Sequence, residues 1–151
     1  MDKLELKSFL MTYLLSLAAF FTPVAGMVLL VTIAVVIDTF VGISHAKWKG
    51  EVVTSGKARV GFIRKMITYS VGLLFAFLLD HLIINDFVKL LFDKDYLFTI
   101  VTTLFLISLE YSSVDEKVRW MSGKGITERV NSFIRNMKDI IIKAKDIKSE
   151  L

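Results

Sequence analysis

Three acidic side chains lie within or beside long apolar stretches of the chain, at Asp38, Asp80 and Glu110. A charge deep in hydrocarbon costs at least ~2.5–3.5 kcal/mol, so such carboxylates normally face protein or water and have partners. Arg64 and Lys65 are basic residues at the start of the second apolar stretch. We predict that these two basic residues form ion pairs with Asp38 and Glu110. The alternative is that all three carboxylates are hydrated at a membrane interface.

Catalytic chemistry has little support in the residue pattern. The two histidines, His45 and His81, are far apart, and no H-E-x-x-H, P-loop, G-x-S-x-G or dinucleotide fingerprint occurs. The absence of cysteine excludes disulfides, thiolate metal sites and a cysteine nucleophile. His81 follows Asp80 directly, which could make a pH-sensitive pair, although most such pairs are structural. We therefore expect a protein that is not an enzyme, with no catalytic residues, no metal site and no cofactor.

The composition is typical of a helical protein with very large apolar surfaces. The chain has 151 residues, 54% of them hydrophobic and 23% charged, and its mean hydropathy is +0.61. Residues 8–37 carry no charge, and this run is longer than the ~20 residues that a membrane-spanning helix needs. A signal peptide does not fit, because its apolar core would be only ~7–15 residues after a basic start.

The hydropathy pattern predicts an all-α integral membrane protein. Pro23 interrupts the first apolar run, because proline lacks the backbone N–H that continues a helix. We expect a membrane-associated helix at residues 4–21, which could itself cross the membrane. The predicted spans are about 24–44, 62–84 and 96–114. These elements form a helical membrane domain at residues 1–121. A soluble all-helical protein with an unusually apolar core is the alternative.

Loop charges predict the orientation of these spans. Residues 45–65 carry six basic side chains against one Glu, whereas residues 85–95 carry two basic side chains and three Asp. Short loops rich in Lys and Arg stay in the cytoplasm, so we place residues 45–65 and the C-terminus inside. The basic inner loop is represented by Lys47, Lys49, Lys57 and Arg59. Because Trp48 and Phe62 are the only aromatic residues there and no nucleic-acid-binding fold is recognisable, we expect it to contact anionic lipid and no nucleic acid.

A face of small residues predicts close packing of the first span. From the middle of this span onward, every fourth residue is small or acidic: Ala34, Asp38, Gly42, Ala46 and Gly50. In membranes such a face lets helix backbones approach closely, so that packing drives helix association. Chance alignment of common small residues is the alternative.

The last quarter of the chain, residues 122–151, has a different pattern. After a break at residues 122–125, apolar residues alternate at spacings of four and three: Ile126, Val130, Phe133, Met137, Ile140, Ala144, Ile147 and Leu151. This 3.5-residue period is typical of a coiled coil. We predict a cytoplasmic amphipathic helix that either associates with further copies or packs onto its own chain.

Residues 37–65 resemble the phage holins grouped with the clostridial toxin-secretion holins. Those proteins carry an Asp, a Gly four residues on and an Ala four further, then a basic loop with Ser, then a Gly and a Lys that open the next span. The matching residues here are Asp38, Gly42, Ala46, Ser55, Gly61 and Lys65. Weaker matches are Asp80, Glu110, Ser113 and Glu116. The resemblance covers about residues 10–118 and leaves out the helix after Gly125.

The resemblance implies a multi-pass protein of the bacterial cytoplasmic membrane that accumulates, oligomerises and forms lesions that release an endolysin or toxin during lysis. Helices would associate through Gly42 and Ala46, and the carboxylates of Asp38, Asp80 and Glu110 would line the lesion. The expected partners are the lipid bilayer, further copies of the chain, and the endolysin pathway or a cytoplasmic protein. Two alternatives are a membrane-anchored scaffold that uses the C-terminal helix and a small oligomeric channel.

Overall fold

The computed structural model describes residues 2–92 and 94–149, and these are helical throughout apart from short turns. The elements in chain order are α1 (Lys3–Trp48), α2 (Ser55–Leu79), the π-helical turn η1 (Asp80–Ile84), α3 (Asn85–Phe92), α4 (Leu97–Ser122) and α5 (Ile126–Ser149). Within the described residues, α1, the continuous stretch from α2 into α3, and α4 are long and apolar enough to cross a membrane. The prediction of an all-α membrane protein is confirmed.

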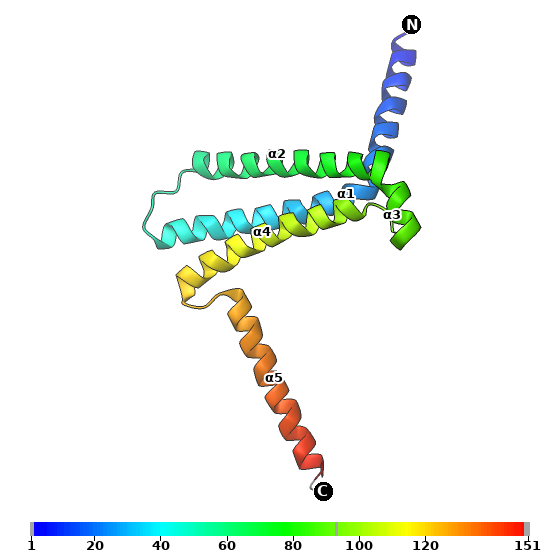
Figure 1. Ribbon diagram of the computed structural model, residues 1–151. Coiled ribbons are helices and arrows are strands. Elements are labelled where there is room, and N and C mark those ends of the chain that lie inside the picture. The colour runs from blue at the N-terminus through cyan, green and yellow to red at the C-terminus, as the bar shows by residue number, and fades with distance from the viewer. Residues whose placement is uncertain (1, 93, 150–151) are drawn as a thin grey trace.

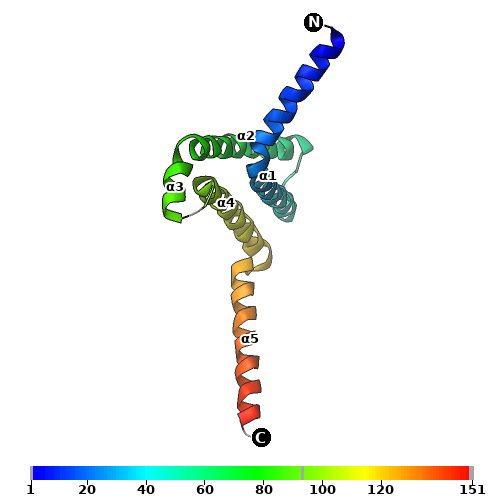
Figure 2. The same ribbon diagram turned by 90° about the vertical axis from the view of Figure 1, so that its right-hand side faces the viewer.

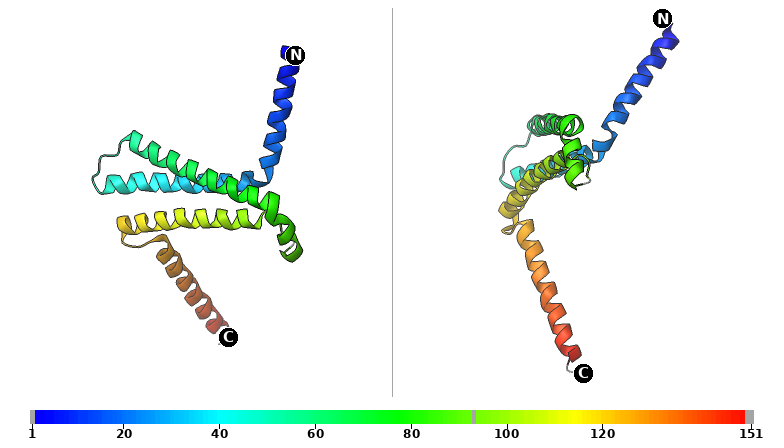
Figure 3. Two further views of the ribbon diagram at one scale, coloured as in Figure 1. Left: turned by 45° about the horizontal axis from the view of Figure 1, so that its top comes forward. Right: turned by 45° about the vertical axis from the view of Figure 1, so that its right-hand side comes forward.

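Three helices form the body of the molecule (Figure 1). The second part of α1 and the whole of α4 run in the same direction, and α2 runs opposite to both, as the turned view also shows (Figure 3). Their shared core consists of Val31, Val35, Leu73 and Leu106. This core is small for three long helices, so most of their apolar surface faces outward.

The outward surface of the bundle is strongly apolar. Large side chains from all three helices are more than half exposed, among them Leu29, Val71, Phe75 and Phe105. A soluble monomer rarely exposes contiguous apolar patches of this extent. The apolar helices are therefore not covered by polar residues in the described part of the chain, which contradicts the alternative of a soluble helical protein.

Helix α1 is continuous through Pro23, so the predicted division into helices at residues 4–21 and 24–44 is wrong. The helix bends sharply near this proline, and its first part stands away from the bundle (Figure 1). Proline removes one hydrogen bond and kinks a helix without ending it when the neighbouring turns stay paired. The bend is held by aromatic packing, with Phe20 ring centroids 5.2 Å from Phe77 and 5.0 Å from His81.

The predicted basic loop at residues 45–65 is also shorter than expected. Helix α1 extends to Trp48, and α2 begins at Ser55 with Thr54 as its N-cap, so residues 49–54 alone connect them. Thr54 Oγ1 accepts a hydrogen bond from the backbone N–H of Lys57 at 3.4 Å. Because this cap starts the helix early, Lys57 and Arg59 lie on α2 and project from its first turns.

Helix α5 leaves the bundle after a turn at residues 123–125, where Gly123 has φ 74 (Figure 2). Of the heptad side chains that the structure describes, Ile126 beside the turn is partly buried, and Val130, Phe133, Met137 and Ile140 are exposed. The side chains of Ala144 and Ile147, and all of Leu151, lie outside the described part of the structure. In the described part, α5 projects away from its own chain and its apolar face is uncovered.

Candidate functional site

A network of charged side chains joins the three bundle helices near the end where α1 leads into α2. Lys65 of α2 lies at its centre, with its Nζ 2.7 Å from Asp38 Oδ2 of α1 and 2.7 Å from Glu110 Oε2 of α4. Both carboxylates are buried, with residue exposures of 4% for Asp38 and 2% for Glu110. The position of Lys65 between two carboxylates links all three helices.

Two further side chains complete this ion network. Lys117 Nζ is 2.5 Å from Asp38 Oδ1, and the Tyr69 hydroxyl donates a hydrogen bond to Glu110 Oε1. Every carboxylate oxygen of the network therefore has a partner, and two lysines balance two acids. A buried ion pair is tolerated when its charges cancel and its remaining hydrogen-bonding groups are satisfied. The ion network, as defined here, consists of Asp38, Lys65, Tyr69, Glu110 and Lys117.

Of the four residues expected to pair, the structure brings together Asp38, Lys65 and Glu110, while Arg64 stays exposed. Among the described residues no acidic group lies within ion-pair distance of Arg64. Consecutive helical residues point about 100° apart, so only one of the two neighbouring cations can face the bundle interior. The pattern also missed Lys117 and Tyr69, although each follows a network residue on the same helix face, at spacings of seven and four.

The small-residue face of α1 is used inside the same chain. Ala34, Gly42 and Ala46 are half-buried, and a Cβ atom placed on Gly42 would lie 3.5 Å from Lys117 Nζ. Gly42 therefore gives room for the lysine that binds Asp38. Gly50 does not belong to this face, because α1 ends at Trp48 and Gly50 lies in the connection with φ 76. The expectation of one continuous face through Gly50 is wrong.

Asp80 occupies a different environment at the opposite end of the bundle. Its side chain is fully buried, and Oδ2 accepts hydrogen bonds from Thr99 N at 2.5 Å and Thr99 Oγ1 at 2.6 Å. Oδ1 accepts a weaker bond from Phe98 N at 3.3 Å. Asp80 thus caps the first turn of α4, where free N–H groups and the helix dipole favour an anion.

His81, expected as a possible partner of Asp80, belongs to an aromatic cluster. Its ring lies 5.6 Å from Phe77 and 6.4 Å from Tyr96 between centroids. Among the described residues, Asp80 and His81 share no hydrogen bond or ion pair. The proposed pH-sensitive pair is therefore not formed.

The turn between α4 and α5 is held by a fourth acidic residue, Asp115, which lies just beyond the predicted span at residues 96–114. Asp115 Oδ1 accepts hydrogen bonds from Thr127 N at 2.9 Å and Thr127 Oγ1 at 3.1 Å. The backbone N–H of Thr127 holds the pKa of Asp115 below its ordinary value. Arg119 adds an ion pair to Glu128 across the turn, at 3.0 Å.

Basic side chains surround the end of the bundle that contains the ion network. Lys47, Lys49, Lys57 and Arg59 are all exposed there, and Lys49 Nζ lies 5.9 Å from the centre of the Trp120 ring. Within the described residues, no group of three or more acidic or histidine side chains is placed to hold a metal ion. The chemistry available at this end is ionic and interfacial.

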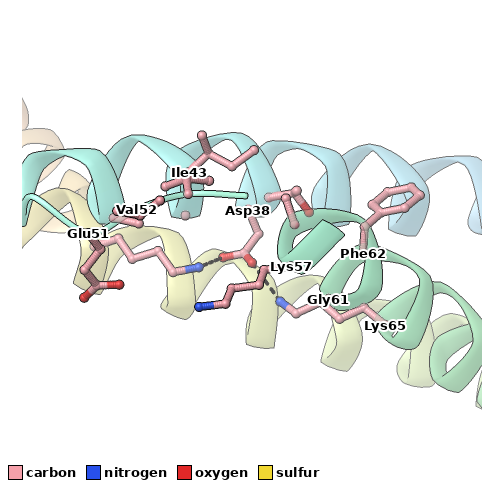
Figure 4. A pocket seen from close by; sticks show the side chains of 14 residues that line it. Asp38, Ile43, Glu51, Val52, Lys57, Gly61, Phe62 and Lys65 are labelled. Carbon is pink, nitrogen blue, oxygen red and sulfur yellow. Dashed lines mark hydrogen bonds and ion pairs between the residues drawn. The ribbon is translucent and has the colours of Figure 1, made fainter. Parts of the chain in front are cut away.

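A cavity of about 300 Å³ opens beside the ion network, between α1, the first turns of α2 and the connection at residues 49–54 (Figure 4). Its polar lining consists of Asp38, Thr39, Glu51, Lys57, Lys65 and Lys117. Ile43, Val52, Val53 and Phe62 contribute apolar walls. The cavity is therefore polar at one end and apolar along its sides.

Three apolar helices with an uncovered apolar surface, and with the charges of the ion network paired between them, define a multi-pass helical membrane protein. The family model of the bacteriophage holin family matches residues 16–139, and the chain belongs to this family. The match extends into α5, so the exclusion of the C-terminal helix from the family pattern is wrong. Neither a curated protein nor a solved structure matches the chain.

Proposed function

We propose that the protein is a phage-type holin that assembles in the bacterial cytoplasmic membrane and forms lesions through which an endolysin or toxin leaves the cell. The observation that carries this proposal is the match to the bacteriophage holin family over residues 16–139. The arrangement of the helices supports it, because a bundle with an apolar exterior, a balanced ion network and a hydrogen-bonded Asp80 can accumulate in a bilayer without harm.

The distribution of charge supports an orientation with the ion network on the cytoplasmic side. The exposed cations Lys47, Lys57 and Arg59 gather at that end. Asp86 and Asp95 lie near the opposite end, beside α3. Positive charge is retained on the cytoplasmic face of a membrane protein. The turn to α5 starts from the same end as the cations, so α5 is also cytoplasmic.

Lesion formation requires the closed bundle to open. Asp38, Asp80 and Glu110 all face the bundle interior, so they can line a water-filled wall only after the helices separate. The ion network is the closing contact at the cytoplasmic end, since Lys65 and Lys117 tie α1, α2 and α4 together. Separation in the presence of further copies would expose these carboxylates to the lesion water, where hydration replaces the lost ion pairs.

Inducible expression in bacteria tests the function directly. We would follow membrane potential together with release of a co-expressed cytoplasmic reporter enzyme. A holin is expected to accumulate, then to collapse the potential and release the enzyme. Loss of potential without enzyme release would instead identify a small ion channel, and an intact potential after high-level accumulation would contradict both.

The exposed α5 helix favours one second candidate, a membrane-anchored scaffold. Apolar side chains along its described part, such as Phe133 at 64% exposure, are not covered by other described residues. Expression of the chain without residues 122–151 separates the two functions. A holin would still permeabilise the membrane, whereas a scaffold would lose its partner and show no permeabilisation with or without the helix.

A further inference from the structure

We propose that the cavity beside the ion network binds the phosphodiester headgroup of an anionic phospholipid. The inference rests on the orientation given under the proposed function, which places this cavity at the level of the cytoplasmic leaflet. Its volume of about 300 Å³ lies at the lower end of the range for small-molecule sites. Basic pockets between membrane helices on the cytoplasmic side are suited to anionic headgroups.

The charge of the cavity identifies an anion as its ligand. Lys65 and Lys117 already neutralise the acids of the ion network, so the cation available to a ligand is Lys57. Among the described residues no carboxylate lies within ion-pair distance of Lys57. Lys57 and Glu51 both line the cavity, and Figure 4 shows the Lys57 side chain extending toward the ion network while the Glu51 carboxylate points away from it.

The apolar walls of the cavity indicate that this anion belongs to a lipid. Val52 and Phe62 place apolar surface beside the cation, which suits a ligand with both a phosphate and an acyl chain. The space beside Gly61 in this wall is open, since a Cβ placed there would meet no atom within 4 Å. A free phosphate ester would gain little from these apolar walls.

The position of Lys57 along α2 fits the depth of a phosphate layer. It lies in the first turn, directly after the Thr54 cap, whereas the apolar part of α2 begins several residues later. A lysine at the end of a membrane helix extends its ammonium toward the headgroups while its stem covers apolar surface. The cavity therefore presents its unpaired charge at the interface.

The test uses the purified full chain in nanodiscs of neutral phosphatidylcholine with increasing phosphatidylglycerol. Native mass spectrometry counts retained lipids, and thermal unfolding reports stabilisation. Lys57→Gln is compared with Arg59→Gln, which removes the same charge from the same helix outside the cavity. Lys57→Gln is expected to weaken phosphatidylglycerol retention about fivefold, and Arg59→Gln to leave it near the wild-type level. Equal losses in both variants would reduce the effect to general surface charge and overturn the site.

A second pair of variants tests the cavity without changing charge. Gly61→Leu fills the space, and Gly72→Leu is its control, since Gly72 also lies on α2 with no atom near a new Cβ but does not line the cavity. Gly61→Leu is expected to reduce retention and Gly72→Leu to preserve it. Unchanged retention in Gly61→Leu would show that no headgroup occupies the cavity. This pair decides the question if Lys57→Gln fails to fold.

Soluble anions distinguish the two sources of phosphate. Inorganic phosphate and glycerol phosphate are added to the protein in neutral nanodiscs, and neither is expected to raise the unfolding temperature. Stabilisation by glycerol phosphate equal to that by phosphatidylglycerol would assign the cavity to a soluble phosphate ester and overturn the lipid proposal.

Enzyme release in cells is measured separately: release with no specific lipid retention refutes the cavity site alone, and retention with no release refutes the holin function alone.

Discussion

Two buried aspartates of the same bundle are stabilised in different ways. Asp38 is held by the ammonium groups of Lys65 and Lys117, whereas Asp80 is held by backbone and hydroxyl donors at the start of α4. The first arrangement depends on opposite charges from other helices. The second uses the partial positive charge of a helix N-terminus, which needs no basic residue.

This difference predicts how each site responds to the loss of one member. Removal of one charged side chain from the ion network leaves an opposite charge without its partner in a partly buried position. Neutralisation of Asp80 strands no charge, because its donors are neutral. The ion network should therefore be the more sensitive of the two sites and should show strong coupling between its members.

The largest effect is expected for Lys65→Met, which leaves Asp38 and Glu110 without their shared cation. Breaking a buried ion pair in this way costs about 3–5 kcal/mol of folding free energy. The double variant Lys65→Met/Glu110→Gln removes equal and opposite charges and leaves the Asp38–Lys117 pair. Denaturant unfolding in detergent should give a coupling energy of about 0.5–3 kcal/mol between the two changes. Simple additivity would show that the network does not act as a unit.

A smaller effect is expected for Asp80→Asn, at about 1.5–3 kcal/mol, which is the range for hydrogen bonds to a charged group. The asparagine side chain keeps one oxygen that accepts from the Thr99 donors, and no charged group loses a partner. Asp38→Asn, by contrast, leaves two lysines with one acid. The same unfolding measurement compares the pair, and a greater loss for Asp80→Asn than for Asp38→Asn would refute the distinction between the two sites.

Asp115 is a third aspartate, and it extends the comparison to the surface of the protein. Solvent weakens electrostatic interactions there. The pKa of Asp115 is lowered, first by the backbone N–H of Thr127. Its contribution to the α4–α5 turn is therefore complete above the unfolded pKa of about 3.9 and is lost as pH falls through the lower folded value. Spin labels at Ser112 and Asn136 should show a broader distance distribution in acid than at neutral pH.

Two variants sharpen the test of this turn. Asp115→Asn should remove the acid response and give a broad distribution at every pH. Gly125→Ala should broaden it at neutral pH, because the new Cβ would lie 2.7 Å from Asp115 Oδ2. An acid response that persists in Asp115→Asn would assign it to another group.

The smallest effect is expected for Gly42→Ala. The added Cβ would meet Lys117 Nζ at 3.5 Å, which is an ordinary contact, and alanine favours a helix interior by about 0.5–1 kcal/mol. Stability should be equal or slightly higher, with unchanged lysis timing. Gly42→Leu should displace Lys117 from Asp38 and alter both lysis timing and detergent-resistant oligomers. Unchanged behaviour of Gly42→Leu would remove this face from the mechanism.

Much of the ion network could be predicted because the energetics of lipid restrict charged residues so strongly. Asp38, Lys65 and Glu110 stand out as charges beside apolar runs, and the orientation rule places them at the same end. Lys117 could not be singled out, since it resembles any basic residue that follows a span and its long side chain reaches back toward the bundle. The double variant Asp38→Lys/Lys65→Asp is therefore not a clean test of the ion pair, because it places a lysine at position 38 beside Lys117.

Features that depend on the backbone were harder to predict. The donors to Asp80 are mainly N–H groups of α4, and every residue except proline has one, so no residue pattern marks them. Pro23 indicates a disturbance of α1 but does not distinguish a bend from an end. The start of α2 within the basic segment at residues 45–65 depends on the Thr54 cap, and threonine is too common a residue to mark this position in the sequence.

The contact between Lys117 and Asp38 also orders events during biosynthesis. These residues are 79 positions apart, so at a synthesis rate of about 5–20 residues per second the second cation follows the acid by roughly 4–16 s. Lys65 is synthesised before Lys117, so Asp38 can gain its full complement of partners only after most of α4 has been made. A nascent chain interrupted before that helix would hold Asp38 with Lys65 alone, without the second cation of the complete bundle.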